Sequence, residues 1–87
     1  MDRECRILAR RIFGMSMLIS EKTKADCFVD YQPHVGGVAV HIYPNGWKVG
    51  ANPTNLLESY RCDKETMSAV YDYLEEFMSN AEWEDVK

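Results

Sequence analysis

The stretch CFVDYQPHVGGVAVHIYPNGWKVGA, residues 27–51, decides the fold, because it combines strand-like alternation with two strong turn signals. Residues 26–32 and 38–43 alternate between inward and outward side chains, as half-buried β-strands do. The proline and glycines of residues 33–37 predict a tight connection between them. The stretch therefore predicts an antiparallel hairpin.

Asn45-Gly46 predicts a second hairpin immediately afterwards. This dipeptide favours a two-residue type I′ turn, in which both central residues need positive φ. A third strand is expected over residues 47–51, so that the sheet spans residues 26–51. Because paired residues share a face, the predicted core face consists of Val38, Val40, Ile42, Trp47 and Val49. The predicted open face consists of Phe28, Asp30, Ala39, His41, Tyr43 and Lys48.

Helical periodicity flanks the predicted sheet on both sides. Residues 2–21 repeat apolar side chains at steps of three and four, which indicates an amphipathic helix. A second helix is predicted over residues 63–80, with Asp63 as its N-cap. Residues 52–62 are expected to form a connection and residues 81–87 an acidic tail.

The element order α-β-β-β-α predicts an α+β fold for a single domain over residues 1–87. Two amphipathic helices most simply cover the apolar face of a three-stranded antiparallel sheet, which gives a two-layer sandwich with both helices on one face.

The net charge of the chain is −4 and is unevenly distributed. Residues 63–87 contain eight acidic and two basic residues, whereas residues 1–26 contain four acidic and six basic ones. A nucleic-acid-binding protein normally carries a basic footprint, so this balance argues against that class. Separated cysteines without a CxxC pair predict free thiols in a reducing cytoplasm. No apolar run has the length of a membrane span.

No motif in the chain specifies catalysis. It contains neither a P-loop nor a nucleophile elbow. His34, His41 and the cysteines are too widely spaced for a structural zinc site, which usually draws on close pairs. We therefore expect a protein that is not an enzyme and that holds no metal and no cofactor.

Two surfaces are candidates for binding a partner protein. The first is the predicted open face of the sheet, where aromatic and charged groups adjoin as they do at interface centres; its residues are Phe28, Asp30, His41, Tyr43 and Lys48. The second is the acidic helix with Asp72, Glu75 and Glu76, which would mimic phosphate charge in a basic groove. Such a charge run is more often simply a solvated face. A second copy of the chain is an alternative occupant of the open face, which would make the protein a self-associating structural or regulatory module.

Residues 28–47, FVDYQPHVGGVAVHIYPNGW, resemble small uncharacterised proteins encoded by bacteriophages and prophages. The matching residues are Asp30, Tyr31, His34, Val35, Tyr43, Gly46 and Trp47. The resemblance implies a mobile-element setting with a host protein as the partner. By analogy it implies inhibition of a host defence or nucleic-acid-handling protein, as anti-CRISPR proteins do.

The element order also resembles that of the double-stranded RNA-binding domain, and QPHVGG places His34 in the first hairpin loop. That family uses a lysine cluster at the start of its second helix. Here CDKETMSA offers Lys64 between Asp63 and Glu65. Binding of double-stranded RNA is therefore an alternative that lacks its electrostatic component.

Overall fold

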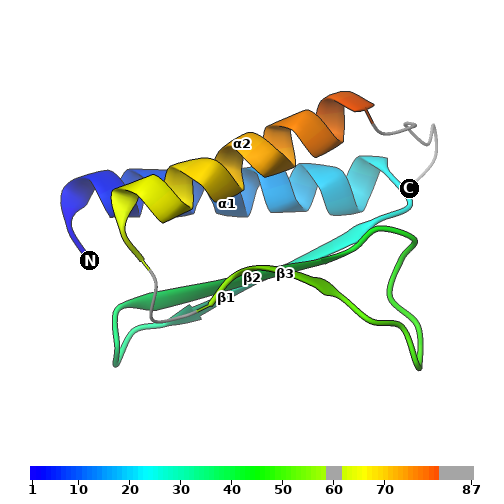
Figure 1. Ribbon diagram of the computed structural model, residues 1–87, viewed down its shortest axis with the longest axis horizontal. Helices are drawn as coiled ribbons and strands as arrows, with labels where there is room; N and C mark the ends of the chain where they lie inside the picture. Colours follow the sequence, from blue (N-terminus) through cyan, green and yellow to red (C-terminus); the bar gives the residue numbers. More distant parts are fainter. Residues whose placement is uncertain (59–61, 81–87) are drawn as a thin grey trace.

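The computed structural model describes residues 1–58 and 62–80, and in it two helices cover one face of a three-stranded antiparallel sheet (Figure 1). The predicted α+β class and element order are confirmed. The acidic tail predicted over residues 81–87 lies outside the described residues. The elements are α1 (Arg3–Lys22), β1 (Asp26–Gln32), β2 (Gly37–Tyr43), β3 (Thr54–Leu57) and α2 (Lys64–Asn80).

Both helices begin at an aspartate cap. The Asp2 carboxylate accepts a hydrogen bond of 2.8 Å from the Cys5 amide at the start of α1. The predicted cap of α2 is confirmed, because Asp63 accepts bonds of 2.8 Å from the Thr66 amide and 2.9 Å from its hydroxyl. Each carboxylate satisfies an amide that the first helical turn leaves without a partner.

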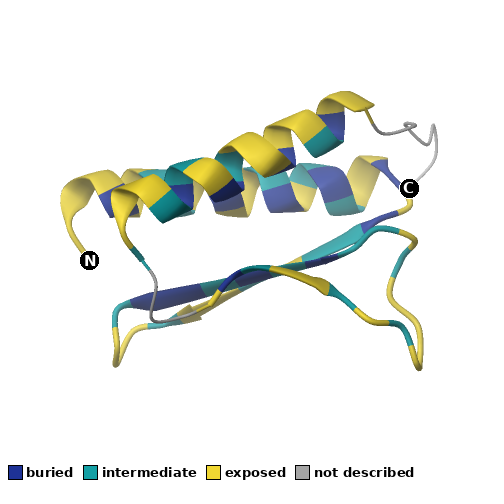
Figure 2. Cartoon of the chain, viewed as in Figure 1, coloured by how far each residue is buried: buried dark blue, intermediate teal, exposed yellow. Residues whose placement is uncertain are grey.

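The core lies between the two helices and the sheet (Figure 2). The helices lie side by side and run in the same direction, with α1 over β1 and α2 over β3 (Figure 1). The most deeply buried apolar side chains come from both helices and from the central strand; those with no exposed surface include Ile12, Ile19, Ile42, Met67 and Leu74. Each such side chain stabilises the fold by roughly 1.5–3 kcal/mol.

The predicted first hairpin is confirmed. In the register of β1 and β2, Phe28 lies opposite His41 and Val29 opposite Val40. The connection contains Gly36 with a φ of 61°, a left-handed conformation that glycine adopts without a steric penalty.

The predicted third strand over residues 47–51 is wrong. Trp47 and Val49, which were expected in the core, are 57 % and 91 % exposed. The third strand is instead β3, which lies in the segment predicted to be a connection. Leu57 is 5 % exposed and pairs with Val40, so it occupies the core-face position assigned to the earlier residues. The sheet therefore extends to Leu57 rather than ending at residue 51.

The Asn45-Gly46 dipeptide fails to form a type I′ hairpin because of its neighbours. Among the described residues no residue other than glycine has a positive φ, so Asn45 lacks the conformation that this turn needs. The turn closes one residue earlier, with a bond of 3.0 Å from the Gly46 amide to the Tyr43 carbonyl. Pro44 then takes the second position, which suits its restricted φ. The Trp47 amide donates to the Asp26 carboxylate at 2.7 Å and so does not pair with β2.

β3 pairs with β2 only along Val40–Ile42. At Val38, on the same side of β2, the hydrogen-bonding partner is a side chain instead of a strand. The Val38 amide donates a hydrogen bond of 3.0 Å to the Cys62 sulfur. The Cys5 thiol in turn donates to the Cys62 carbonyl at 3.3 Å. Cys62 therefore links the sheet to the start of α1 just before α2 begins.

Candidate functional site

The face of the sheet that the helices leave uncovered carries an aromatic cluster, which we define as Phe28, His41 and Tyr43. Side chains alternate along each strand, so these residues lie on the face of the sheet that is opposite to the one carrying the buried Val40 and Ile42. The sequence predicted that these three side chains share a face, and the register places them together.

The rings of the aromatic cluster contact one another in favourable geometries. The Phe28 and His41 rings stack with an interplanar angle of 3° and a centroid separation of 5.1 Å. Tyr43 meets Phe28 and His41 edge to face, with centroids 5.6 Å and 5.8 Å away. Pairs of aromatic rings in such arrangements contribute about 0.5–1.5 kcal/mol beyond their buried area. The cluster is thus held in place by contacts among its own rings, although Phe28 is 43 % exposed.

The two charged residues predicted for this face have different positions. Asp30 is exposed on β1 and pairs with Ala39 on the same face as the cluster. Lys48 lies in the connection before β3, at the start of a turn closed by a bond of 3.0 Å from the Ala51 amide to its carbonyl. The predicted place of Lys48 in a third strand is therefore wrong, and strand pairing does not place Lys48 on the open face.

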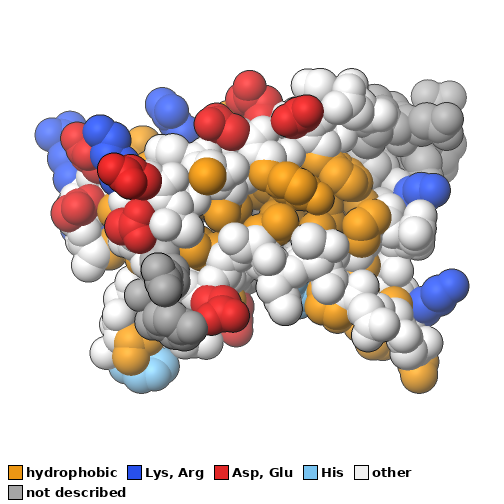
Figure 3. Space-filling model, in the orientation of Figure 1, with side chains coloured by type: hydrophobic (Ala, Val, Ile, Leu, Met, Phe, Trp, Pro, Cys, Tyr) orange, Lys and Arg blue, Asp and Glu red, His pale blue; other side chains and the backbone are white. Residues whose placement is uncertain are grey.

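The acidic residues of α2 form a separate surface. Asp72, Glu75 and Glu76 are all exposed on α2, in the layer above the sheet. The open sheet face lies on the other side of the molecule, so the fold does not bring the two predicted binding surfaces together. Acidic side chains lie along the α2 side, above a hydrophobic patch (Figure 3).

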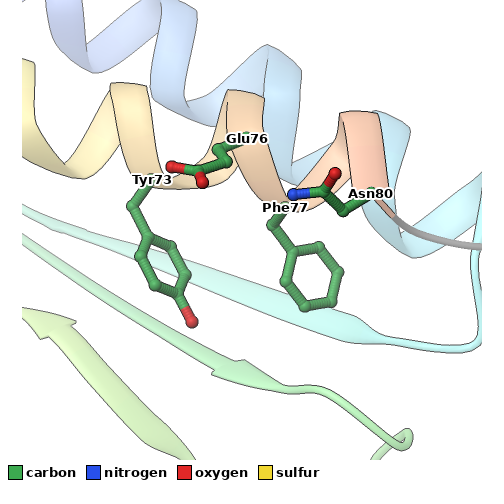
Figure 4. A pocket seen from close by; sticks show the side chains of 4 residues that line it. All are labelled: Tyr73, Glu76, Phe77 and Asn80. Atoms are coloured by element: carbon green, nitrogen blue, oxygen red, sulfur yellow. The ribbon is translucent and has the colours of Figure 1, made fainter.

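The hydrophobic patch beside α2 includes a shallow groove that the sequence did not predict. It has a volume of about 320 Å³ and is lined by Tyr73, Glu76, Phe77 and Asn80. The rings of Tyr73 and Phe77 project from α2 toward the sheet (Figure 4). Tyr73 and Phe77 are four residues apart in the predicted second helix, and a helical pair at i and i+4 shares one face, so this spacing was the available signal.

A second unpredicted apolar surface runs between α1 and β1. Phe13 and Met17 on α1 are each 51 % exposed, and Tyr31 on β1 is 63 % exposed. Phe13 and Met17 are also four residues apart in the predicted first helix, so the sequence contained a signal for this surface as well.

Two of the cysteine thiols lie in surroundings that lower their reactivity. Burial raises the pKa of the Cys27 thiol and of the Cys5 thiol, so both are protonated near neutral pH and are poor nucleophiles. Within residues 1–58 and 62–80, no group of three or more histidine, cysteine or acidic side chains is placed to hold a metal ion. Neither helix in this part of the chain is long and apolar enough to cross a membrane.

Comparison with protein-family models, with curated proteins and with solved structures finds no match to this chain.

Proposed function

We propose that this chain is a non-enzymatic protein-binding protein whose contact surface is the open face of the sheet. The observation that supports this most directly is the aromatic cluster. Its rings are fixed by mutual stacking and Phe28 stays accessible. Rigid aromatic side chains bind with little loss of conformational entropy, and they dominate many interface centres.

The negative charge of Asp30 and the resemblance to phage proteins suggest the kind of partner. Asp30 beside the aromatic cluster favours a partner surface that carries a basic group. A phage or prophage setting makes that partner a host protein, and the proposed action is inhibition of a host defence or nucleic-acid-handling protein. The acidic residues Asp72, Glu75 and Glu76 are the competing contact surface.

A pull-down from bacterial lysate with the tagged chain tests this proposal. The double variant His41→Ala, Tyr43→Ala is expected to lose the captured protein. Val49→Ser is the matched control, because Val49 is 91 % exposed and lies outside both candidate surfaces. The variant Glu75→Gln, Glu76→Gln tests the acidic helix. Equal capture by the wild type and the aromatic double variant, with both folded by circular dichroism, would refute the open face as the contact surface.

Two alternatives have tests of their own. Self-association predicts a dimer in sedimentation at about 100 µM, a concentration well above that needed by a standard-sized interface. Binding of double-stranded RNA predicts a gel shift at low salt, where electrostatic binding is strongest. Against RNA binding, Lys64 at the start of α2 lies 3.2 Å from the Glu4 carboxylate, so its charge is already partly compensated.

A further inference from the structure

The outer edge of β1 is closed over one part of its length. The hydroxyls of Ser16 and Ser20 on α1 donate to the Cys27 carbonyl at 2.9 Å and 3.3 Å, and the Cys27 amide donates to the Ser20 hydroxyl at 2.9 Å. The backbone groups of Cys27 therefore point away from β2 and are satisfied by α1. An added strand has no access to the edge at this residue.

The same edge is open farther along β1. Backbone groups in an antiparallel strand point alternately to its two sides, so those of Val29 and Tyr31 point outward, as Cys27 does. The hydrogen bonding of β2 supports this orientation of Tyr31. Val38 pairs with Tyr31, and its amide donates to Cys62 on the side away from β1, so the two residues do not bond to each other. Within the described part of the chain, α1 presents no hydrogen-bonding partner to Val29 or Tyr31.

A groove accompanies the open part of the edge. It has a volume of about 570 Å³, and its lining includes Ala9 and Phe13 of α1 together with Val29 and Tyr31 of β1. The side chains of Arg6 and Arg10 also line it. A strand beside Val29 and Tyr31 would direct alternate side chains into this groove and the others onto the open face of the sheet.

A second copy of the chain does not suit this edge. Symmetric antiparallel pairing centred on Val29 requires the backbone of Cys27, which the serines occupy. Pairing centred on Tyr31 places Val29 opposite Pro33, which has no amide hydrogen. Pairing centred on Asp30 places the two Asp30 carboxylates directly opposite each other, which is repulsive. Each symmetric register therefore has a specific obstacle.

We propose that the edge of β1 at Val29–Tyr31 binds an extended segment of another protein as a fourth strand, with a basic residue of that segment opposite Asp30. The two neighbours of that basic residue are apolar and enter the groove beside Phe13. Arg6 and Arg10 disfavour a basic residue on the groove side. The basic side chain of the segment therefore points to the open face, and the apolar side chains point into the groove. This inference deepens the proposed function, because it names the chemistry of a bound protein segment.

Peptide titration followed by NMR tests the proposal on the intact chain. The probe is the capped peptide Ser-Thr-Val-Lys-Val-Thr-Ser, and the matched control has glutamate in place of lysine. Strand addition uses hydrogen bonds from the two valines. A probe N-methylated at both valines is therefore expected to lose binding, whereas N-methylation at the lysine, whose amide faces away, should have a much smaller effect.

The expected result is that the lysine peptide, titrated to about 1 mM, shifts the Val29 and Tyr31 amide signals and slows their hydrogen exchange. The glutamate peptide should bind roughly threefold to tenfold more weakly, in keeping with a single cross-strand charge pair. The variant Asp30→Lys should reverse this preference. Because Asp30 is exposed, this variant is expected to fold.

Other results overturn the proposal in distinguishable ways. Shifts confined to Phe28, His41 and Tyr43 would locate binding on the open face alone, which contradicts the edge and leaves the proposed function standing. If Asp30→Lys still prefers the lysine peptide to the glutamate peptide, the proposed pairing of a basic residue with Asp30 is refuted. A stable dimer of the free chain would identify a second copy as the occupant. Absence of binding by both peptides would refute strand addition, whereas the pull-down with the aromatic double variant tests the proposed function separately.

Discussion

The side chain of Ser20 and the backbone of Cys27 exchange two hydrogen bonds: the Ser20 hydroxyl accepts from the Cys27 amide at 2.9 Å and donates to its carbonyl at 3.3 Å. This reciprocal pair fastens α1 to the outermost strand of the sheet. It also supplies the backbone groups of an edge residue with partners that a neighbouring strand would otherwise provide.

Replacement of Ser20 by alanine is expected to destabilise the fold by about 1–3 kcal/mol, because the partly buried Cys27 amide loses its acceptor. Urea unfolding measures the change, and hydrogen exchange at Cys27 should become faster. Ser79→Ala is the control, since its hydroxyl bonds to the Glu75 carbonyl on the exposed side of α2. Equal unfolding midpoints for the two variants would contradict this role of Ser20.

The corrected position of the third strand predicts a contrast between Trp47 and Ile42. Ile42→Ala is expected to destabilise the protein by about 2–5 kcal/mol, because Ile42 has no exposed surface and its truncation leaves a cavity. Trp47→Ala should cost less than about 1 kcal/mol, since more than half of this side chain is exposed and its hydrogen bond to Asp26 comes from the backbone. A larger loss for Trp47→Ala in chemical unfolding would support the register predicted from the sequence instead.

The N-cap of α1 predicts a pH dependence of stability. The hydrogen bond from the Cys5 amide holds the pKa of Asp2 below its ordinary value of 3.8. The folded-state pKa is thus lower than the unfolded-state pKa. The stability from the carboxylate is therefore complete above about pH 4 and is lost as the pH falls through the folded-state pKa.

Asp2→Asn isolates this contribution, because asparagine caps a helix without titrating. The wild type should lose more stability than Asp2→Asn as the pH falls, and urea midpoints measured across the acid range report the difference. A difference that stays constant from neutral to acid pH would show that the Asp2 charge does not contribute.

Asp30 predicts a gain of self-association on its removal. Asp30→Val eliminates the carboxylate repulsion in the symmetric register of β1 and leaves an apolar edge, which is prone to pair with another chain. Sedimentation is expected to show a dimer for this variant and a monomer for the wild type at the same concentration. Asp72→Val, at an exposed position on α2, is the control for added hydrophobicity. Dimerisation of both variants would point to nonspecific association.

The helices, the first hairpin and the element order could be predicted because each rests on local periodicity. The pattern of Ile12 and Ile19 in α1, and of Met67 and Leu74 in α2, corresponds to the buried faces in the structure. The shared face of Phe28, His41 and Tyr43 followed from alternation and from one correctly placed turn. Within these elements, local signals and tertiary packing agree.

The third strand could not be predicted because its position depends on contacts between distant residues. Asn45-Gly46 is a strong local signal, but the turn is displaced by Pro44 and by the Asp26 carboxylate, which lies on another strand. The apolar pair Leu56-Leu57 lies in the segment predicted to be a connection, and the local sequence does not indicate that Leu57 pairs with Val40. The open edge at Val29–Tyr31 likewise depends on which α1 side chains reach β1, and periodicity alone does not contain that information.

Cys62 and Asp63 are consecutive residues that stabilise different elements: Cys62 accepts the hydrogen bond from the Val38 amide of β2, and Asp63 caps α2. These two residues therefore fix the rotation of α2 about its axis relative to the sheet. An insertion of one residue here would rotate the buried face of α2 away from the core or leave the Val38 amide without its acceptor. In the connection between β2 and β3, Trp47 is held by Asp26, whereas the hydrogen bond described for residues 48–53 joins Ala51 to Lys48 within one turn. Changes in chain length are consequently expected to accumulate in that connection and to be excluded at residues 62–63.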